Sequence, residues 1–211
     1  MSRLRFNWAA ARAHLRGACP QLATFIDDFG PGRYRVEGGD DLFLDLAQSI
    51  AYQQLSGKAA ATIFARFEQL FQGGQPDAAR TLELGFEPLR SCGLSGAKTL
   101  AILDLAEHQV SGALPSRRAL ARMDDEQVIR QLSRVRGIGP WTVQMHLIFT
   151  LGRPDVMPAT DYGVQKGVQR VYELEQLPQP KQVLEQTRHL APYRSLAAWY
   201  FWRASEAPTG D

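Results

Sequence analysis

The sequence predicts an all-α protein, because its apolar residues recur at helical spacing and signals for β-strands are nearly absent. Short segments rich in glycine or proline separate the periodic stretches. The one weak strand candidate is Arg33–Glu37, which follows Gly30-Pro31-Gly32. A chain of 211 residues is long enough for one compact domain, arranged as two helical lobes around a cleft.

Amphipathic stripes predict the helices of the first half. The N-terminal segment 1–17 has such a pattern, and the stripe Leu42, Leu46 and Ile50 follows Asp40, the expected N-cap. A helix that begins near Ser95 is predicted to bury Leu100, Leu103 and Ala106. The helix after Ser56 is expected to end at Gly73-Gly74, and its stripe comprises Ala60, Ile63, Phe64, Phe67 and Phe71.

The second half carries clearer start signals. Asp124 followed by Gln127 is a capping-box pattern before Val128 and Leu132. Asp161 precedes a further stripe, which places it at or near the first turn of a helix. The stripes of this half are Val164, Val168 and Val171, then Val183, Leu184 and Leu190, and finally Leu196, Trp199 and Phe201–Trp202.

Composition excludes several classes of protein. Hydrophobic residues make up 45% of the chain and charged residues 22%, which is typical of a globular protein and not of a disordered one. Two cysteines are too few for a disulfide scaffold, a four-cysteine zinc site or a four-cysteine iron–sulfur cluster. No apolar run is long enough to span a membrane, and the N-terminus lacks the apolar core of a secretory signal, so we expect a cytoplasmic protein.

The most informative stretch is the predicted helical hairpin at 132–151. One helix ends at Gly137-Ile138-Gly139, and Pro140 is well suited to the first position of the next. Backbone N–H groups of such a turn and of the following helix form a site for an anion such as a phosphate oxygen. Thr142 would add a hydroxyl donor, and Arg134 and Arg136 bring positive charge. The alternative is a helical corner that uses its glycines only to turn.

Beyond the hairpin, Gly152 is followed by the loop Arg153–Pro158, which contains two prolines, and then by Asp161. In this order the three features resemble the HhH-GPD base-excision DNA glycosylases, and within them the short form of the 3-methyladenine DNA glycosylase II branch. The resemblance implies a single glycosylase domain over 1–211, with the hairpin at about 125–151, the catalytic loop and helix at about 152–172, and no separate N-terminal domain. The matching stretches are Ile50–Ala60, Gly93–Lys98, the hairpin through Gly167, and Pro192–Trp202.

Asp161 falls on the family's catalytic aspartate. Cleavage of an N-glycosidic bond builds positive charge on the deoxyribose, and a fixed carboxylate stabilises that charge and orients the attacking water. An ordinary N-capping role is the alternative from local sequence, and the two roles are compatible.

Trp141 indicates the sub-class. Relatives that also cut the strand carry a lysine at this position, and an indole cannot form their Schiff base. The resemblance therefore implies hydrolysis without lyase activity. Lys166 lies outside that motif and is interpreted as a phosphate contact.

By resemblance, aromatic faces line the pocket for the flipped base. A cationic methylated purine gains about 0.5–2 kcal/mol from each good aromatic face. The expected pocket residues are Trp141, Trp202, Tyr162, Tyr200 and Met145, the last standing where relatives carry another aromatic.

Two further loops are expected to face DNA. Gln53, Gln54 and Leu55 lie where the family inserts a plug into the minor groove, with Gln54 or Leu55 favoured; a capped turn at Ser56 is the alternative. Leu94 and Ser95 resemble the loop that touches the opposite strand. Basic residues that begin the next helices, Lys58 and Lys98, are interpreted as phosphate contacts.

The expected partner is double-stranded DNA that carries alkylated bases, bound by a monomer. No cofactor is required. The resemblance implies a Na or K ion at the main-chain carbonyls of Ser133, Val135 and Ile138.

The sequence thus favours a monofunctional glycosylase that excises 3-methyladenine and 7-methylguanine, with 1,N6-ethenoadenine or hypoxanthine as further substrates. The alternatives are a catalytically silent helix-hairpin-helix module that binds DNA, a bifunctional glycosylase/lyase and a hydrolase of small nucleosides.

Overall fold

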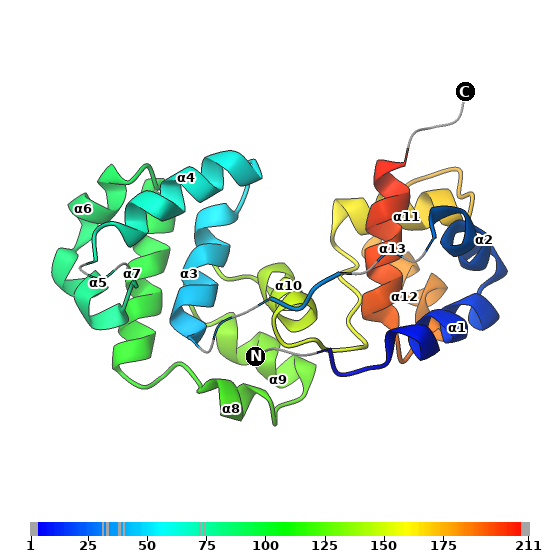
Figure 1. Cartoon of the computed structure of the whole chain (residues 1–211), viewed down its shortest axis with the longest axis horizontal. Helices are drawn as coiled ribbons and strands as arrows, with labels where there is room; N and C mark the ends of the chain where they lie inside the picture. Colours follow the sequence, from blue (N-terminus) through cyan, green and yellow to red (C-terminus); the bar gives the residue numbers. More distant parts are fainter. Residues whose placement is uncertain are drawn as a thin grey trace. The chain divides into compact units, whose positions relative to one another are not determined.

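The computed structural model describes residues 4–30, 32, 34–37, 39, 41–71, 73 and 75–207. Within these ranges every regular element is a helix, which confirms the all-α prediction (Figure 1). Arg33 lies outside the described residues, and residues 34–37 form no strand, so the strand candidate is wrong there. No helix of the described ranges has both the length and the apolar character needed to cross a membrane.

The chain divides into two compact units, and its expected single-domain character stays a prediction. Unit 1 comprises Gly38–Val143 and Met1. Within it, α7 packs against α3, α5 and α6 (Figure 1). Its helices are α3 (Leu42–Tyr52), α4 (Gly57–Glu68), α5 (Ala78–Leu84), α6 (Phe86–Ser91), α7 (Gly96–Val110), α8 (Arg117–Leu120), α9 (Asp125–Leu132) and the start of α10 (Pro140–Phe149).

Three predicted details of unit 1 are wrong. Asp41 caps α3 by accepting a hydrogen bond from Leu44 N, whereas the predicted cap, Asp40, lies outside the described residues. Helix α4 ends at Glu68, and Gly73 lies beyond it with a φ of 97°; Gly74 is not among the described residues.

The third detail is the buried face of α7. Leu100 is 39% exposed, whereas Ala101, Ile102, Leu105 and Ala106 are buried. Leu100 therefore does not face inward as predicted and Leu103 is half-buried, whereas the burial of Ala106 is confirmed.

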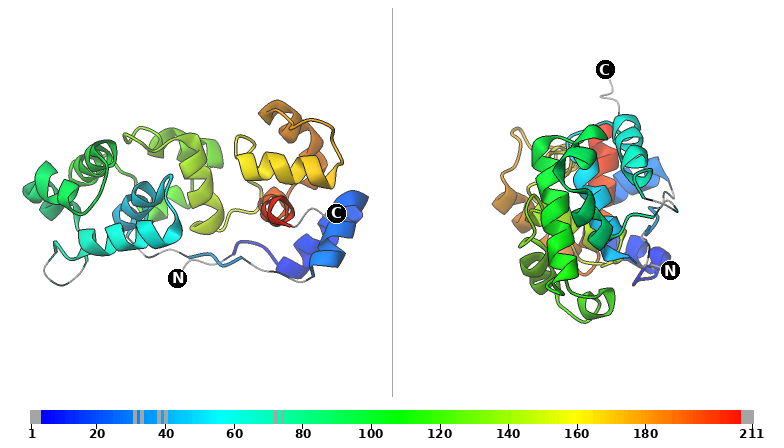
Figure 2. Two further views of the ribbon diagram at one scale, coloured as in Figure 1. Left: turned by 90° about the horizontal axis from the view of Figure 1, so that it is seen from above. Right: turned by 90° about the vertical axis from the view of Figure 1, so that its left-hand side faces the viewer.

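Unit 2 comprises Ser2–Glu37 and Gln144–Asp211. Helix α13 lies at its centre, with α11 crossing it closely and α1 and α2 on another side (Figure 2). The helices are α1 (Trp8–Ala18), α2 (Pro20–Phe29), the end of α10, α11 (Tyr162–Val171), α12 (Pro180–Gln186), the 3-10 helix η1 (Arg188–Leu190) and α13 (Arg194–Glu206).

An aromatic cluster joins the N-terminal segment to α13. Trp199 is 9% exposed, and its ring centroid lies 6.0 Å from that of Trp8 and 6.4 Å from that of Tyr34. Burial raises the pKa of the Tyr34 hydroxyl above its usual value. Trp199 is therefore a core residue.

The crossing of α11 and α13 depends on Gly167. A Cβ at this position would lie 2.6 Å from the Phe201 Cα and would overlap the Phe201 carbonyl. Backbone atoms at the middle of a helix have little freedom to move, so only glycine fits here.

We expect Gly167→Ala to lower the free energy of unfolding by about 3 kcal/mol, because α11 must move away from α13. Gly17→Ala is the control: Gly17 lies in α1 with nothing within 4 Å of an added Cβ, and stability should stay the same or rise by up to about 1 kcal/mol. Urea unfolding of the two variants measures both values. If Gly167→Ala were as stable as the wild type, the close crossing of α11 and α13 would be contradicted.

Candidate active site

Asp161 is the N-cap of α11 and the centre of the candidate active site. Its Oδ1 accepts a hydrogen bond from Val164 N at 2.9 Å and another from the indole Nε1 of Trp202 at 2.7 Å. The predicted N-cap is confirmed. The same carboxylate oxygen also accepts a hydrogen bond from a side chain of α13. Together the two hydrogen bonds fix the orientation of the carboxylate.

Space for this contact comes from Gly163 in the first turn of α11. A Cβ there would lie 2.8 Å from Trp202 Cδ1 and 3.1 Å from Asp161 Oδ1. On its other side, the half-buried Trp202 ring packs on Phe149, with ring centroids 5.6 Å apart and planes inclined by 33°. The indole therefore has a defined position between α10 and α11.

The loop that leads to Asp161 is anchored by an ion pair. Nε and Nη2 of Arg194 donate to the two carboxylate oxygens of Asp155, both at 2.8 Å, and Arg194 N donates to Oδ1 at 3.2 Å. Partial burial raises the pKa of the Asp155 carboxyl, but the hydrogen bonds and charge of Arg194 outweigh burial and hold the pKa below its usual value.

A second tether joins the loop to the same helix. The buried Ser195 accepts from Val156 N through its hydroxyl at 2.9 Å, and its backbone N donates to the Pro154 carbonyl at 3.0 Å. Because α13 also carries Trp202, one helix holds both the indole and the loop that precedes Asp161.

The predicted pocket aromatics separate into two groups. Tyr162 is 66% exposed and Trp141 41% exposed, and Met145 is half-buried. Tyr200 is fully buried, with its ring against Phe25 and Phe29 of α2. The prediction that Tyr200 lines the pocket is therefore wrong, because it points into the core of unit 2.

The hairpin loop contains two glycines with different constraints. Gly137 has a φ of 75°, and its Cβ would lie 3.0 Å from the Ala101 Cβ. Gly139 has no atom within 4 Å of an added Cβ, so nothing in the described chain requires glycine there. Arg134 and Arg136 are exposed beside this loop. No contact within the described chain requires glycine at position 139. Glycine there would let a bound ligand come close to the backbone, because it has no side chain.

Thr142 was predicted to add a hydroxyl donor at the hairpin, but it is only 6% exposed. Its Oγ1 accepts from Nε2 of Gln53 at 3.3 Å, and the same nitrogen donates to the Gly137 carbonyl at 3.0 Å. Gln53 therefore joins the turn after α3 to the hairpin loop, and its contact with DNA stays a prediction.

The rest of that turn faces outward. Gln54 is exposed and has a φ of 56°, a left-handed conformation that residues other than glycine adopt rarely. Leu55 is 41% exposed. Ser56 is the N-cap of α4 without a side-chain capping bond, and Lys58 is exposed in the first turn. These positions agree with a surface that meets a partner.

The second predicted loop is corrected at Leu94, which is 1% exposed and belongs to the core, whereas Ser95 is exposed and caps α7. Lys98 donates from Nζ to the carbonyls of Ala51 at 2.9 Å and Gln53 at 2.6 Å, and partial burial lowers the pKa of its ammonium group. Lys98 thus holds the end of α3, and its contact with phosphate stays a prediction.

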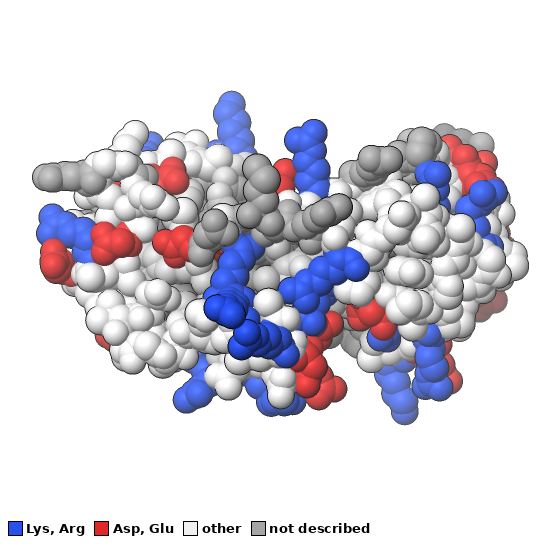
Figure 3. Space-filling model, turned by 60° about the horizontal axis from the view of Figure 1, so that its bottom comes forward, with Lys and Arg blue, Asp and Glu red and all other residues white. Residues whose placement is uncertain are grey.

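Lys166, which was also predicted to contact a phosphate, is half-buried on α11. In Figure 3, Lys and Arg side chains lie among Asp and Glu side chains, as a net charge of +2 indicates. No cluster of three metal-ligating side chains occurs in the described ranges.

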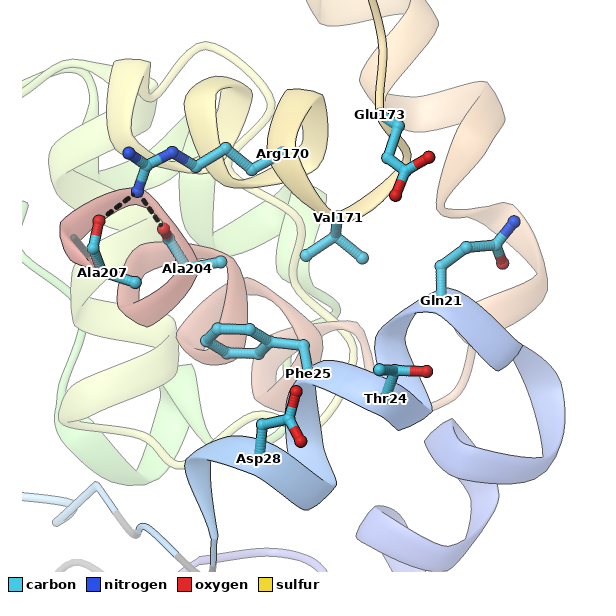
Figure 4. Close-up of a pocket in the computed structure, with 9 residues that line it drawn as sticks. All are labelled: Gln21, Thr24, Phe25, Asp28, Arg170, Val171, Glu173, Ala204 and Ala207. Carbon is cyan, nitrogen blue, oxygen red and sulfur yellow. Dashed lines mark hydrogen bonds between the residues drawn. The ribbon is translucent and has the colours of Figure 1, made fainter. Parts of the chain in front are cut away.

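A cavity of about 390 Å³ lies in unit 2 between α2, α11 and the end of α13. Arg170 borders it, but its guanidinium donates to the carbonyls of Ala204 at 2.7 Å and Ala207 at 2.6 Å (Figure 4). The cavity contains none of the predicted site residues, so we assign it no role in the chemistry.

Sequence reasoning missed Phe149, Arg194 and Ser195 as parts of the site. Arg194 and Ser195 fall within Pro192–Trp202, a stretch that had been singled out, but nothing local pairs them with Asp155 or Val156. Phe149 is an ordinary apolar position of its helix. Only the packing of α10 and α13 reveals these contacts.

Comparisons with known proteins agree with this arrangement. A family model described as HhH-GPD superfamily base excision DNA repair protein matches residues 47–192. The chain is 35% identical over 200 residues to DNA-3-methyladenine glycosylase 1 of Schizosaccharomyces pombe, covering 93% of this chain and 87% of that protein.

Solved structures show the same fold. The S. pombe 3-methyladenine DNA glycosylase Mag1 in complex with abasic DNA superposes with a TM-score of 0.84 at 34% identity, over 94% of this chain and 97% of that one. A DNA-3-methyladenine glycosidase from Bacillus halodurans gives a TM-score of 0.82 at 32% identity, over 92% and 88% of the two chains.

The Asp155–Arg194 pair predicts a dependence of stability on pH. Because the pKa of Asp155 is depressed in the folded state, its contribution is present above the usual carboxyl pKa of about 4 and is lost as pH falls through the folded value. We expect Arg194→Met to lower the free energy of unfolding by about 2 kcal/mol at pH 7. Below a pH of about 4, the difference in free energy of unfolding between this variant and the wild type should become smaller.

Urea unfolding across that pH range measures the difference from the wild type. Arg80→Met is the matched control, since its pair with Glu83 is exposed on both sides and should change stability by less than about 1 kcal/mol. A difference for Arg194→Met that stays constant with pH would show that the ion pair is not its source.

Proposed function

The chain belongs to the HhH-GPD superfamily of base excision DNA repair proteins, and we propose that it is a DNA glycosylase that excises alkylated purines from duplex DNA. The proposed main substrates are 3-methyladenine and 7-methylguanine. Further proposed substrates are 1,N6-ethenoadenine and hypoxanthine. The similarity to 3-methyladenine glycosylases over nearly the whole chain supports the first of these.

The observation that carries the proposal is the carboxylate of Asp161 held at the start of α11 by Val164 N and Trp202 Nε1. As the bond between C1′ and the base lengthens, positive charge develops on the sugar, and this carboxylate stabilises it. Water then bonds to C1′, and its proton passes to the carboxylate. Hydrogen bonds to Oδ1 keep the group oriented throughout.

An alkylated purine assists its own departure. A purine methylated at N3 or N7 carries a positive charge before cleavage and takes the electron pair of the glycosidic bond, so it leaves neutral and needs no general acid. In unit 2, the exposed Tyr162 and the half-buried Trp202 supply aromatic surface for such a cationic base.

Strand cleavage is not part of the proposed reaction. A lyase needs an amine that attacks C1′, and the hairpin position where bifunctional relatives carry lysine is Trp141. The product is then an abasic site in an intact strand, and borohydride should trap no covalent adduct between protein and DNA.

Duplex DNA is bound through the hairpin loop, where the exposed Gly139 lets a phosphate approach the backbone N–H groups. Gln54 and Leu55 are the proposed residues that fill the gap left by the flipped base. We propose that a monomer performs the reaction in the cytoplasm with the chromosomal DNA.

No cofactor takes part in this chemistry. The carbonyls proposed for a Na or K ion are those of Ser133, Val135 and Ile138. The Val135 carbonyl accepts from Ile138 N at 3.1 Å and keeps a second lone pair, so it fits a cation ligand. Such an ion would supply positive charge beside the phosphate.

We expect Asp161→Asn to lower single-turnover excision of 7-methylguanine by at least about 1000-fold, because the charge that stabilises the sugar cation is lost. Affinity for an abasic duplex should change less than about threefold, since phosphate contacts supply most of it. Base release followed by chromatography, and fluorescence anisotropy, measure the two quantities.

Asp77→Asn is the matched control, because Asp77 is also a capping aspartate, with Oδ1 accepting from Arg80 N at 2.9 Å. Asparagine caps helices about as well as aspartate, so this variant should excise normally. Normal excision by Asp161→Asn would overturn the mechanism. A wild-type protein that binds DNA but releases no base would favour the silent DNA-binding module.

Gly139→Ala tests the hairpin. Since a Cβ at Gly139 meets no atom of the described chain, stability should be unchanged, but the added methyl group should reduce affinity for duplex DNA about tenfold by holding a phosphate away. Anisotropy titrations at fixed salt measure the affinity, with Gly17→Ala as the control. Unchanged affinity would show that phosphate does not approach this glycine.

A further inference from the structure

Helix α7 holds two of the loops that face outward in unit 1. Near its start, Lys98 Nζ donates to the carbonyls of Ala51 and Gln53 at the end of α3. Almost two turns later, Asp104 Oδ2 accepts from Arg136 N at 2.7 Å. Successive contacts on α7 therefore reach the turn after α3 and the hairpin loop.

Ala101 lies between these two positions and controls how closely the hairpin approaches. The Cβ of Ala101 lies 3.0 Å from the place a Cβ would occupy on Gly137, so this glycine lets the loop lie directly on α7. Residues 98, 101 and 104 follow one another at intervals of three and share one side of the helix.

Gln53 completes a closed circuit of hydrogen bonds. Its backbone carbonyl is held by Lys98, and its side chain donates to the Gly137 carbonyl and to Thr142 Oγ1. The turn after α3 is thus bonded to α7 and to the hairpin loop, and α7 is bonded to the hairpin loop in turn.

We propose that Gln53, Lys98 and Asp104, here called the loop brace, are positioning residues that set where the turn carrying Gln54 and Leu55 stands relative to the phosphate-binding hairpin. This inference rests on the proposed function. The brace touches neither the base nor the sugar, and it acts on the step in which the nucleotide leaves the stack and Gln54 or Leu55 takes its place.

The conformation of the turn explains why a brace is needed. Gln54 has a left-handed backbone, which costs about 1 kcal/mol or more and persists only where neighbouring contacts hold it. Residues on both sides are fixed, Gln53 by the circuit and Ser56 by its carbonyl, which accepts from Ala60 N at 3.0 Å in the first turn of α4. With the hairpin on a phosphate, a fixed turn presents its side chains at one depth and loses little freedom when they insert.

The test compares two duplexes that differ only in the cost of flipping. One carries 7-methylguanine opposite cytosine, and the other carries it opposite thymine, a mismatch that lowers the cost of unpairing. Single-turnover excision is measured for wild type, Lys98→Met and Gln53→Ala. Lys98→Arg, which keeps two donors for the carbonyls of Ala51 and Gln53, is the conservative variant. Arg80→Met, at an exposed position of α5, is the control.

Both brace variants should excise the paired lesion about tenfold more slowly than wild type, and the mismatched lesion less than about threefold more slowly. Lys98→Arg should recover most of the rate, and Arg80→Met should match wild type. Fluorescence of 2-aminopurine beside the lesion should show slower flipping in the brace variants.

An equal loss on the two duplexes would overturn the proposal, because a general structural defect lowers both rates alike. Unchanged rates for both variants would overturn it as well. A wild-type protein that releases no base from either duplex would instead refute the proposed function, so the two failures are distinguishable.

Discussion

The close crossing of α11 and α13 at Gly167 determines the geometry of the candidate active site. The Phe201 backbone occupies the space of a side chain on Gly167, and the next residue, Trp202, reaches Asp161 Oδ1 at 2.7 Å. Gly163, one turn earlier in α11, likewise leaves space for the Trp202 ring. A pair of glycines four residues apart thus brings two helices together and leaves room for an indole between them.

This arrangement makes the capping aspartate a preorganised charge. In an ordinary N-cap the side chain serves only the first turn, whereas Asp161 also receives a donor from another helix. Catalysis by electrostatic stabilisation is effective when the stabilising group does not reorganise during the reaction. The pair of tethers from Arg194 and Ser195 extends this rigidity to the preceding loop.

In unit 1, some polar side chains of the candidate DNA-binding segments bond within the chain, and neighbouring residues stay exposed. Gln53, Lys98 and Thr142 lie in segments that face outward, but their side chains bond to neighbouring backbone or to each other. Gln54, Leu55 and Gly139 are left open to a partner. Residues that bond within the chain thus lie close to residues that stay exposed, and the internal bonds keep this irregular surface in one shape.

Local chemistry determined much of this protein from sequence alone: the helical class, the capping box at Asp124, the start of α10 at Pro140 and the cap at Asp161. Each depends on contacts within a few residues, which sequence spacing encodes directly. Tertiary structure alone decided that Tyr200 and Leu94 are core residues, that Lys98 holds α3, and that Arg194 anchors Asp155. Those roles depend on which distant backbone lies within hydrogen-bonding reach, and a lysine or tyrosine has the same local signature whether it meets a phosphate, a carbonyl or a packed ring.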